Sequence, residues 1–569
     1  MQNLYTSTFQ ASPAVTKLLH DGHIIGNSET PADMIERIVA ALGEQEFIFT
    51  KDSTRAAAAV ARFGELLDSK AIVMSTPIMT NSGRHEGRPL SACIMPPISL
   101  LSDLKLIREK IDDLHQQGMG TGFNLTEVDN PIEILRSLNS IALHGSESGL
   151  EERPVGNMAT MSVYHPDILE FIRIKKHAPR DKEPWKFNIS VDLDEAFFDA
   201  LDADADITLS DGTHVSAAEI FKEICEAAHI SADPGVIFLE RMNLRNPVPG
   251  LGTYKTTAPC AEVGLTEGEA CQFGYLNLAA FVSGFDDGET LVGVDLDKLR
   301  EATEILTRFL DNALEISILN YSAEETKAIM TAKRKIGVGL CGVADALTML
   351  GLPYDSERGR QIMTDLMAFI NYHSKLASIQ LAEERGACRA MEMMHGEGNR
   401  YYDVDGGFLT MLYGNGVAST VSPDQWKALD EHIKSTGLLR NTSTIALPPT
   451  GRSALVIEAS PGIEPHFTHG DRNEIVRAAA EAYVEHANLD TNEAHTYQAI
   501  AKSITPEAHI AMVASFQQYT DEAISKTINL PHDATIESTV NTYLTAWRSK
   551  LNGATLYVDN THHLQPRSL

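Results

Sequence analysis

Apolar residues recur at helical spacing through the first part of the chain. Between residues 31 and 42 they fall on one face of a helix, and Pro31 would occupy the first helical position after a Thr30 N-cap. The alanine-rich stretch 55–67 continues the same pattern. The pattern predicts a helical scaffold over residues 11–70, with no chemistry of its own.

Strand-like and helix-like segments alternate along the rest of the chain. Apolar runs predict a strand at 185–191, a strand and turn at 234–243, and a strand followed by a helix at 333–347. The glycine-rich stretch 118–124 is expected to be a turn, and by itself it is weak evidence for nucleotide binding. In a chain of 569 residues, this pattern favours one large α/β barrel with appendages, or two to three domains.

Acidic residues outnumber basic ones, 78 to 47, which gives a formal net charge of −31. This charge disfavours adhesion to nucleic acid or to anionic membranes, so we expect neither as a partner. A phosphorylated substrate would need a local pocket rich in hydrogen-bond donors. The first residues lack the basic and apolar runs of a leader, and no long apolar stretch follows, so we expect a cytoplasmic protein.

Six cysteines are too few for the disulfide framework of a secreted protein, and in a reducing compartment a cysteine pair is more often redox-active than structural. The most distinctive thiol is Cys260, which follows Pro259 and lies two residues before Glu262. In an extended segment Cys260 and Glu262 would share one face, and Pro259 argues against a central strand or helix. We expect an exposed loop that presents a sulfur and a carboxylate together, although the spacing alone also fits a packing role.

A second polar cluster follows an apolar strand that ends at Pro448 and Pro449, where residues 450–453 read Thr-Gly-Arg-Ser. This sequence is typical of a helix start, where free backbone amides, two hydroxyl groups and a guanidinium group favour an anion. Both a phosphate site and an ordinary capped turn fit the pattern.

The stretch 256–278 resembles the finger-loop signature of ribonucleotide reductase large chains, which reads Asn-Pro-Cys-Gly-Glu and then Glu-Ala-Cys-Asn-Leu-Gly-Ser-Ile-Asn-Leu. The matching positions are Pro259, Cys260, Glu262, Glu269, Ala270, Cys271, Gly274, Asn277 and Leu278. Residues 449–454 resemble the family's phosphate cradle, Pro-Thr-Gly-Thr-Ile-Ser, with Arg452 in place of Thr. The resemblance covers nearly the whole chain, with its motifs in family order.

The resemblance implies an α/β fold, a ten-stranded α/β barrel of the ribonucleotide reductase type with an N-terminal helical domain. Its two five-stranded parallel halves would be antiparallel to each other, with Cys260 on a loop through the centre. We expect the helical domain at residues 1–72, the barrel at 73–545 with its finger loop at 256–278, and a C-terminal strand and short tail at 546–569.

The resemblance also implies a role for each candidate site residue. Cys260 would carry a thiyl radical that takes the 3′-hydrogen of the ribose, and Glu262 would accept the proton of the 3′-hydroxyl. Cys93, in the segment after an expected first barrel strand at 74–84, would supply two electrons together with Cys271 and form a disulfide. The residues expected to bind substrate are Thr76, Ala258, Pro449, Thr450, Gly451, Arg452 and Ser453, and none is assigned to a metal.

The C-terminal part resembles the adenosylcobalamin-dependent class II branch. Class I chains have adjacent tyrosines in this region, whereas Tyr557 is followed by Val558. The resemblance therefore implies adenosylcobalamin, with its cobalt, as the cofactor and ribonucleoside di- or triphosphates as substrates. It also implies an external dithiol reductant such as a thioredoxin, and it is compatible with a homodimer.

Departures from the family pattern leave alternatives open. Ala258 replaces an asparagine that hydrogen-bonds the ribose in the family, and the tail 560–569 lacks the usual cysteines. The segment 123–131, which corresponds to the family's effector loop 1, is shortened. The segment 144–158, which corresponds to loop 2, lacks the family's basic, glycine-rich sequence. We therefore expect altered or lost allosteric control. One alternative is a diverged radical enzyme on the same fold that acts on another nucleotide or nucleoside. The other is a silent paralogue that only binds nucleotide.

Overall fold

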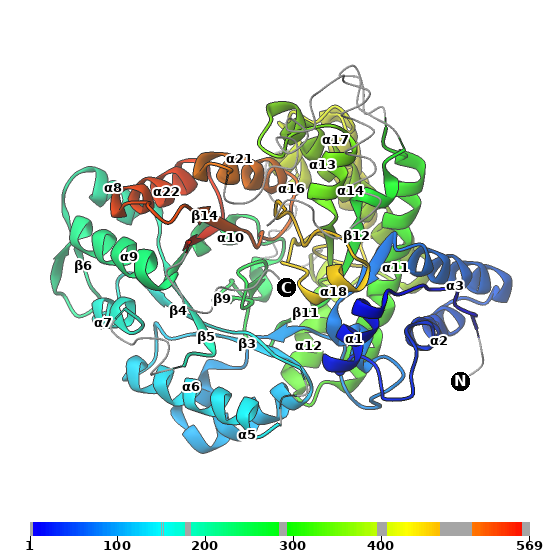
Figure 1. Cartoon of the computed structure of the whole chain (residues 1–569), viewed down its shortest axis with the longest axis horizontal. Coiled ribbons are helices and arrows are strands. Elements are labelled where there is room, and N and C mark those ends of the chain that lie inside the picture. Colours follow the sequence, from blue (N-terminus) through cyan, green and yellow to red (C-terminus); the bar gives the residue numbers. More distant parts are fainter. Residues whose placement is uncertain are drawn as a thin grey trace.

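Three helices, α1 (Pro13–Asp21), α2 (Pro31–Phe49) and α3 (Ser53–Asp68), form the N-terminal scaffold that the apolar periodicity predicts. Thr30 caps α2 in a capping box with Asp33, and Pro31 is its first residue, as expected. The three helices lie near the N-terminus in Figure 1, in dark blue. The computed structural model describes residues 4–149, 151, 153–176, 184–283, 293–394, 407–466 and 503–559.

The larger of two main sheets has eight strands. In spatial order they are β11 (Ala270–Cys271), β2 (Cys93–Ile94), β3 (Gly120–Asn124), β4 (Asn157–Ser162), β5 (Phe187–Asp192), β8 (Gly235–Ile237), β15 (Gly553–Val558) and β14 (Thr527–Leu530). The run from β2 to β8 is parallel, and β11 and β15 pair with its two ends in the antiparallel sense. β14 is parallel to β15.

The second main sheet places β12 (Phe273–Asn277) between β1 (Ile72–Met74), which is antiparallel to it, and β13 (Gly337–Cys341), which is parallel. Only Gln272 separates β11 from β12, so a continuous segment joins the two sheets. Parallel bridges from Val338 to Ile445 and from Leu447 to Ile524 extend the second sheet toward β14. In the described part of the chain, the named strands do not form one closed barrel.

Helices make up most of the remaining elements, and in Figure 1 they lie around the strands. Those in the first half are α4 (Thr76–Asn81), α5 (Leu104–Gln116), α6 (Pro131–Glu147), α7 (Ile168–Arg173), α8 (Glu195–Asp202), α9 (Ala217–Ser231) and α10 (Leu239–Leu244). Those in the second half are α11 (Leu296–Asn320), α12 (Glu324–Lys333), α13 (Val343–Met349), α14 (Glu357–Arg385), α15 (Arg389–Met394), α16 (Phe408–Tyr413), α17 (Pro423–Thr436), α18 (Arg452–Val456), α21 (Pro506–Gln517) and α22 (Ile536–Arg548). A small hairpin, β6 (Asp206–Thr208) and β7 (His214–Ser216), precedes α9.

Several predicted elements are confirmed and two are wrong. The strand at 185–191 is β5, and residues 333–347 contain β13 and then α13. The expected first strand at 74–84 is wrong, because β1 ends at Met74 and Pro77 lies in the first turn of α4, a position that proline favours. The expected turn at 118–124 is also wrong, because residues 120–124 form β3.

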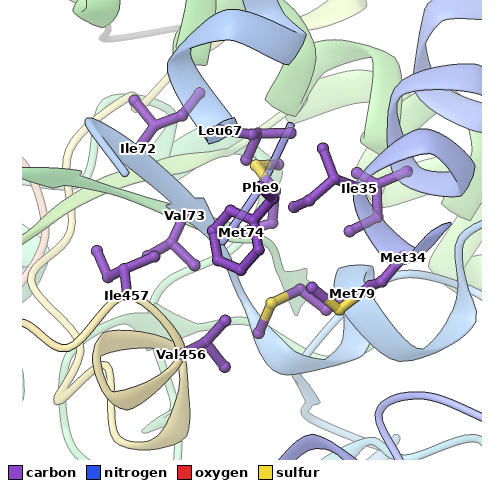
Figure 2. Close-up of a pocket in the computed structure, with 11 residues that line it drawn as sticks. Phe9, Met34, Ile35, Leu67, Ile72, Val73, Met74, Met79, Val456 and Ile457 are labelled. Carbon is purple, nitrogen blue, oxygen red and sulfur yellow. The ribbon is translucent and has the colours of Figure 1, made fainter. Parts of the chain in front are cut away.

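The N-terminal helices pack against β1 and α18 through apolar side chains. A small cavity of about 10 Å³ remains in this contact, and Figure 2 shows side chains from the helices, β1 and α18 converging on it. Its lining residues are Phe9, Met34, Ile35, Ile38, Leu67, Ile72, Val73, Met74, Met79, Val456 and Ile457. Farther along α2, the buried Glu46 pairs with Arg308 of α11 and Arg385 of α14. The helical scaffold is thus joined to the rest of the protein by both apolar packing and buried charge.

The cysteines outside the candidate site are packed in the interior of the protein. Cys225, Cys341 and Cys388 are buried, and burial raises the pKa of each thiol. Among the described residues, no helix is both long and apolar enough to cross a membrane.

Candidate active site

Cys260 lies at the tip of a short hairpin. β9 (Thr256–Thr257) pairs with β10 (Gly264–Leu265), and the Ala261 N–H donates to the Ala258 carbonyl across a tight turn at 2.9 Å. Pro259 takes the second position of this turn, which suits its fixed φ, and Ala261 has a φ of +62°. The extended segment expected for Cys260 and Glu262 is therefore wrong, since the chain reverses between them.

Glycines in the large sheet let this hairpin lie against the strands. A Cβ at Gly122 would lie 2.4 Å from the Thr257 carbonyl oxygen, and a Cβ at Gly156 would lie 3.0 Å from Pro259. Gly120 also faces Pro259, at 3.3 Å from its Cγ. The glycine positions of β3 thus leave space for the hairpin, whose strand β9 lies in the middle of the molecule in Figure 1.

A buried ion cluster holds the base of the hairpin. Glu269 pairs with Lys333 and Lys335 at 3.1 and 3.0 Å, and Lys335 also pairs with Glu522 at 3.3 Å. Although burial alone would raise it, the two ammonium groups lower the pKa of Glu269 to about 2. The Lys335 ammonium donates to the Gly264 carbonyl at 2.8 Å, and Glu522 accepts from the Gly264 N–H. The cluster thereby fixes the strand that follows Glu262.

Cys260 and Glu262 differ in exposure. The Cys260 side chain is exposed, yet the surrounding protein and the nearby Glu262 carboxylate raise the pKa of this thiol well above its usual value. Glu262 is only 3% exposed, its Oε2 has no hydrogen-bond partner, and burial raises its pKa to about 7. The arrangement keeps Cys260 as an S–H group, which suits hydrogen-atom transfer better than nucleophilic attack.

Cys93 and Cys271 form a cross-strand pair next to this tip. Cys271 of β11 is directly opposite Cys93 of β2. Burial, and then the nearby Cys93 thiol, raise the pKa of Cys271 well above its usual value. Directly opposed residues of an antiparallel pair have Cα separations that a disulfide can span without backbone movement. Both thiols are free, Cys271 is buried and Cys93 is half-buried, and Cys93 contributes to the raised pKa of Cys260. The three cysteines are therefore neighbours.

The residues expected to hold a phosphate lie on a tight segment before α18. Thr450 has a φ of +60°, and its hydroxyl oxygen accepts from the Gly462 N–H at 2.8 Å. The amides of Gly451 and Ser453 donate to the carbonyls of Pro449 and Thr450, so fewer amides are free than the sequence suggested. The Ser453 hydroxyl is buried without a partner. Of the groups expected here, this hydroxyl and the side chain of residue 452 stay available to a ligand.

Arg452 brings positive charge to the site. Its guanidinium forms no hydrogen bond or ion pair with the part of the chain that the structure describes. It acts electrostatically on Arg153, which is also under the influence of Cys93 and donates to the Gly118 carbonyl at 2.8 Å. Two guanidinium groups are therefore close enough to influence each other, and one of them is also close to Cys93.

The remaining expected residues are less available. Thr76 is the half-buried first residue of α4, next to the strand β1 that pairs with β12. Ala258 is fully buried and belongs to the apolar core. Among the described residues, no group of three or more His, Cys, Asp or Glu side chains could hold a metal ion.

Sequence reasoning missed Tyr275. This residue lies on β12 and is 4% exposed. Burial first, and then the charge of Glu262 and the nearby Cys271 and Cys260 thiols, raise the pKa of its phenol well above the usual value. The family signature has Ser at this position, so the replacement by Tyr could have marked the residue as a departure.

Comparisons with known proteins agree with this geometry. The model of the ribonucleotide reductase barrel domain matches residues 114–557. A vitamin B12-dependent ribonucleoside-diphosphate reductase from Thermoplasma acidophilum is 31% identical over 91% of this chain and 67% of its own length. A protein of the same name from Mycobacterium tuberculosis is 29% identical over 95% of this chain and 77% of its own length. A vitamin B12-dependent ribonucleotide reductase from Streptomyces clavuligerus is 24% identical over 87% of this chain and 59% of its own length.

The matched segment contains the hairpin, Cys271, the buried ion cluster and the phosphate segment, and the aligned relatives extend the match over the helices before it. The chain belongs to the ribonucleotide reductase barrel-domain family.

Proposed function

We propose that this protein reduces ribonucleotides to 2′-deoxyribonucleotides by radical chemistry. The observation that carries the proposal is the grouping of one exposed thiol, Cys260, with a buried carboxylate and a cross-strand cysteine pair. The names of the relatives, which describe vitamin B12-dependent reductases of ribonucleotides, support the same reaction.

Each residue has a distinct task in this reaction. A thiyl radical on Cys260 takes the 3′-hydrogen atom of the ribose, and Glu262 accepts the proton of the 3′-hydroxyl. The 2′-hydroxyl leaves as water, and Cys93 and Cys271 together give up two electrons and two protons as they form a disulfide. The hydrogen atom then returns from Cys260 to C3′. The net reaction consumes one ribonucleotide and two thiols, and it yields one deoxyribonucleotide, one water and one disulfide.

Glu262 is suited to its task by its environment. A carboxyl group with a pKa of about 7 can both take and return a proton near neutral pH. Its Oε2 has no partner in the protein, so this atom is available to a substrate hydroxyl.

We propose adenosylcobalamin as the cofactor. The group carries its own cobalt, so its fit depends on open access to Cys260 rather than on protein metal ligands. Cys260 is exposed, whereas Glu262, Cys271 and Tyr275 near it are buried. Of these four side chains, only that of Cys260 is therefore open to a bound cofactor. When bound, the group supplies homolytic bond cleavage as a source of an unpaired electron. Cys260 is the residue of this chain that would face it.

The strand pairings support a ten-stranded barrel as the finer description of the fold. The parallel strands β2, β3, β4, β5 and β8 would form one half. β12, β13, the segment around Ile445, the segment from Ile524 through β14, and β15 would form the other half. The bridges at Val338 and Leu447, with the antiparallel pairs at β11 and β15, give the neighbours that closure needs. The proposed domains are residues 1–72, 73–545 and 546–569, of which the tail 560–569 lies outside the described residues.

The proposed substrate is a ribonucleoside di- or triphosphate, with its phosphates near residues 449–453 and Thr76. The unpaired Arg452 guanidinium and the buried Ser453 hydroxyl support an anion there. An external dithiol such as a thioredoxin would reduce the Cys93 and Cys271 disulfide, with half-buried Cys93 as its accessible sulfur. We place the protein in the cytoplasm as a homodimer.

One observation favours a second candidate, a radical enzyme of the same fold with another nucleotide or nucleoside as substrate. Ala258 presents only a buried methyl group where the family signature has an amide. A substrate with different ribose contacts would fit such a site.

The test is anaerobic incubation with adenosylcobalamin, a small dithiol and the common ribonucleoside di- and triphosphates, with products read by mass spectrometry. The wild type should form deoxyribonucleotides, and Cys260→Ala should lower the rate by about a thousandfold or more. Cys225→Ala removes a buried thiol elsewhere and should retain activity. A wild type that makes no deoxyribonucleotide from any of these substrates would contradict the proposed reaction.

A further inference from the structure

Tyr275 lies where the segments of the candidate site meet. On β12 it is opposite Val73 of β1, two residues before the Ser75 N-cap of α4, and beside Gly339 of β13. A Cβ at Gly339 would lie 2.9 Å from Cδ1 of Tyr275 and 3.1 Å from Cδ of Pro448. Gly339 therefore leaves space for the tyrosine ring, next to the chain that leads into the phosphate segment.

The Tyr275 phenol has no hydrogen-bond partner among the described residues, and its oxygen keeps some contact with open space although the residue is only 4% exposed. Other buried tyrosines of the protein are satisfied: the Tyr543 hydroxyl donates to the Pro234 carbonyl at 3.1 Å, and the Tyr254 hydroxyl donates to Glu522 at 3.2 Å. A hydroxyl group without a protein partner, at the accessible end of an otherwise buried side chain, is free to donate a hydrogen bond to a ligand in the adjoining space.

A second unpartnered group lies near this phenol. Glu262 is the strongest of the charges that act on Tyr275, and its Oε2 is buried without a partner. The two groups are chemically complementary, because a phenol donates a hydrogen bond and a carboxylate accepts one. Both lie near Cys260, whose thiol also acts on Tyr275.

We propose that Tyr275 is a substrate-contacting residue whose hydroxyl donates a hydrogen bond to the 2′-oxygen of the ribose. This inference rests on the proposed function. The 3′-hydroxyl donates to Glu262 and the 2′-oxygen accepts from Tyr275, so the two side chains together recognise a ribose cis-diol. The product lacks the 2′-oxygen and loses the contact, so Tyr275 also distinguishes substrate from product.

The competing explanation is that Tyr275 only fills space between β1 and β13. Phenylalanine would then serve equally well, because it keeps the ring and removes only the oxygen. The two explanations differ in whether the effect of that oxygen depends on the 2′-hydroxyl of the ligand.

The experiment is a cycle of calorimetric binding measurements without cofactor. Wild type and Tyr275→Phe are each titrated with a ribonucleoside diphosphate and with its 2′-deoxy and 3′-deoxy forms. We expect the variant to bind the ribonucleotide and the 3′-deoxy form about five- to tenfold more weakly than wild type does, and the 2′-deoxy form unchanged. Tyr543→Phe, which removes a buried hydroxyl elsewhere, should leave all three affinities unchanged.

Three results would overturn the proposal: no loss in Tyr275→Phe, an equal loss for all three ligands, or a loss that follows the 3′-hydroxyl. Equal affinity of the wild type for the ribonucleotide and its 2′-deoxy form would do the same without any variant. A wild type that binds no ribonucleotide overturns both this inference and the proposed function. If the expected affinities are found but the protein makes no deoxyribonucleotide, the role proposed for Tyr275 stands and only the proposed reaction is overturned.

Discussion

Cys271 of β11 lies directly opposite Cys93 of β2, and the two thiols are neighbours. The pair is ready to form a disulfide without a change in the backbone, because opposed residues in antiparallel strands already have a suitable separation. This relationship makes the stoichiometry of the reaction testable.

Without an external reductant, each chain should therefore complete about one turnover and then carry a Cys93 to Cys271 disulfide. Mass spectrometry of peptides should detect the linked pair after incubation with substrate and cofactor, and Cys93→Ser or Cys271→Ser should abolish dithiol-dependent turnover. Cys388→Ala, at a buried cysteine outside the site, is the matched control. Unchanged turnover in either serine variant would contradict the assigned role.

Because of Glu262, kcat/KM should rise with pH on the acidic side of neutrality. If the ionised carboxylate accepts the substrate proton, kcat/KM should increase about tenfold per pH unit below a pKa of about 7 and level off above it. Glu262→Gln should remove this rise and lower kcat by about a hundredfold or more. The rate should be measured from pH 5.5 to 8.5, and a wild-type profile that is flat through this range would exclude Glu262 as the base.

The same carboxyl group should make the folded protein less stable as pH rises. Burial raises the pKa of Glu262 from 4.5 to about 7, so between these values the folded chain holds a proton that the unfolded chain has lost. The free energy of unfolding should therefore fall across this window, by on the order of 3 kcal/mol from this group.

Accordingly, Glu262→Gln should be more stable than wild type at pH 8 and nearly equal to it at pH 4. Urea denaturation at both pH values provides the measurement, with Glu44→Gln at an exposed site as the control. A variant that is less stable than wild type at pH 8 would count against burial as the cause of the shift.

Gly122→Ala should displace the hairpin that carries Cys260. The added methyl group would lie 2.4 Å from the Thr257 carbonyl oxygen, so β9 must move away from β3. We expect a loss of about 1–3 kcal/mol in the free energy of unfolding and about a hundredfold in kcat. Gly26→Ala is the matched control, since its Cβ would meet only Glu29 at 3.9 Å. Full activity in Gly122→Ala would show that the close approach is not needed.

Arg452→Ala should weaken the binding of phosphorylated substrates. Removal of a free guanidinium from the proposed phosphate segment should raise KM for a ribonucleoside diphosphate about tenfold or more, with a smaller effect on kcat. The exposed Lys17 on α1 offers a control, and Lys17→Ala should behave as wild type. An unchanged KM in Arg452→Ala would move the phosphate site elsewhere.

Local signals in the sequence predicted the local features well. The Thr30 cap and Pro31 fix the start of α2, and the apolar run before Val343 gives β13 and α13. The signature around Cys260 indicated an exposed loop and the residues that would carry the chemistry, because those residues are close together in the sequence or belong to recognisable motifs.

The features that were missed depend on contacts between distant residues. Nothing in the order of residues indicates that Lys335 would meet both Glu269 and Glu522, since each lies on a different element. The sequence predicts a turn at Gly122, because a glycine in a strand is explained only by what packs over it. Tyr275 reads as an ordinary apolar position of β12 until its partnerless hydroxyl is placed beside Glu262.

The state of the Cys260 thiol has a practical consequence for anyone who maps cysteines chemically. Alkylating reagents attack the thiolate, and the surrounding protein together with the Glu262 carboxylate keeps this sulfur protonated at neutral pH. Cys260 should therefore label slowly with iodoacetamide even though it is exposed. Slow labelling of Cys260 would therefore report the low acidity of its thiol rather than burial, unlike slow labelling of the interior residues Cys225, Cys341 and Cys388.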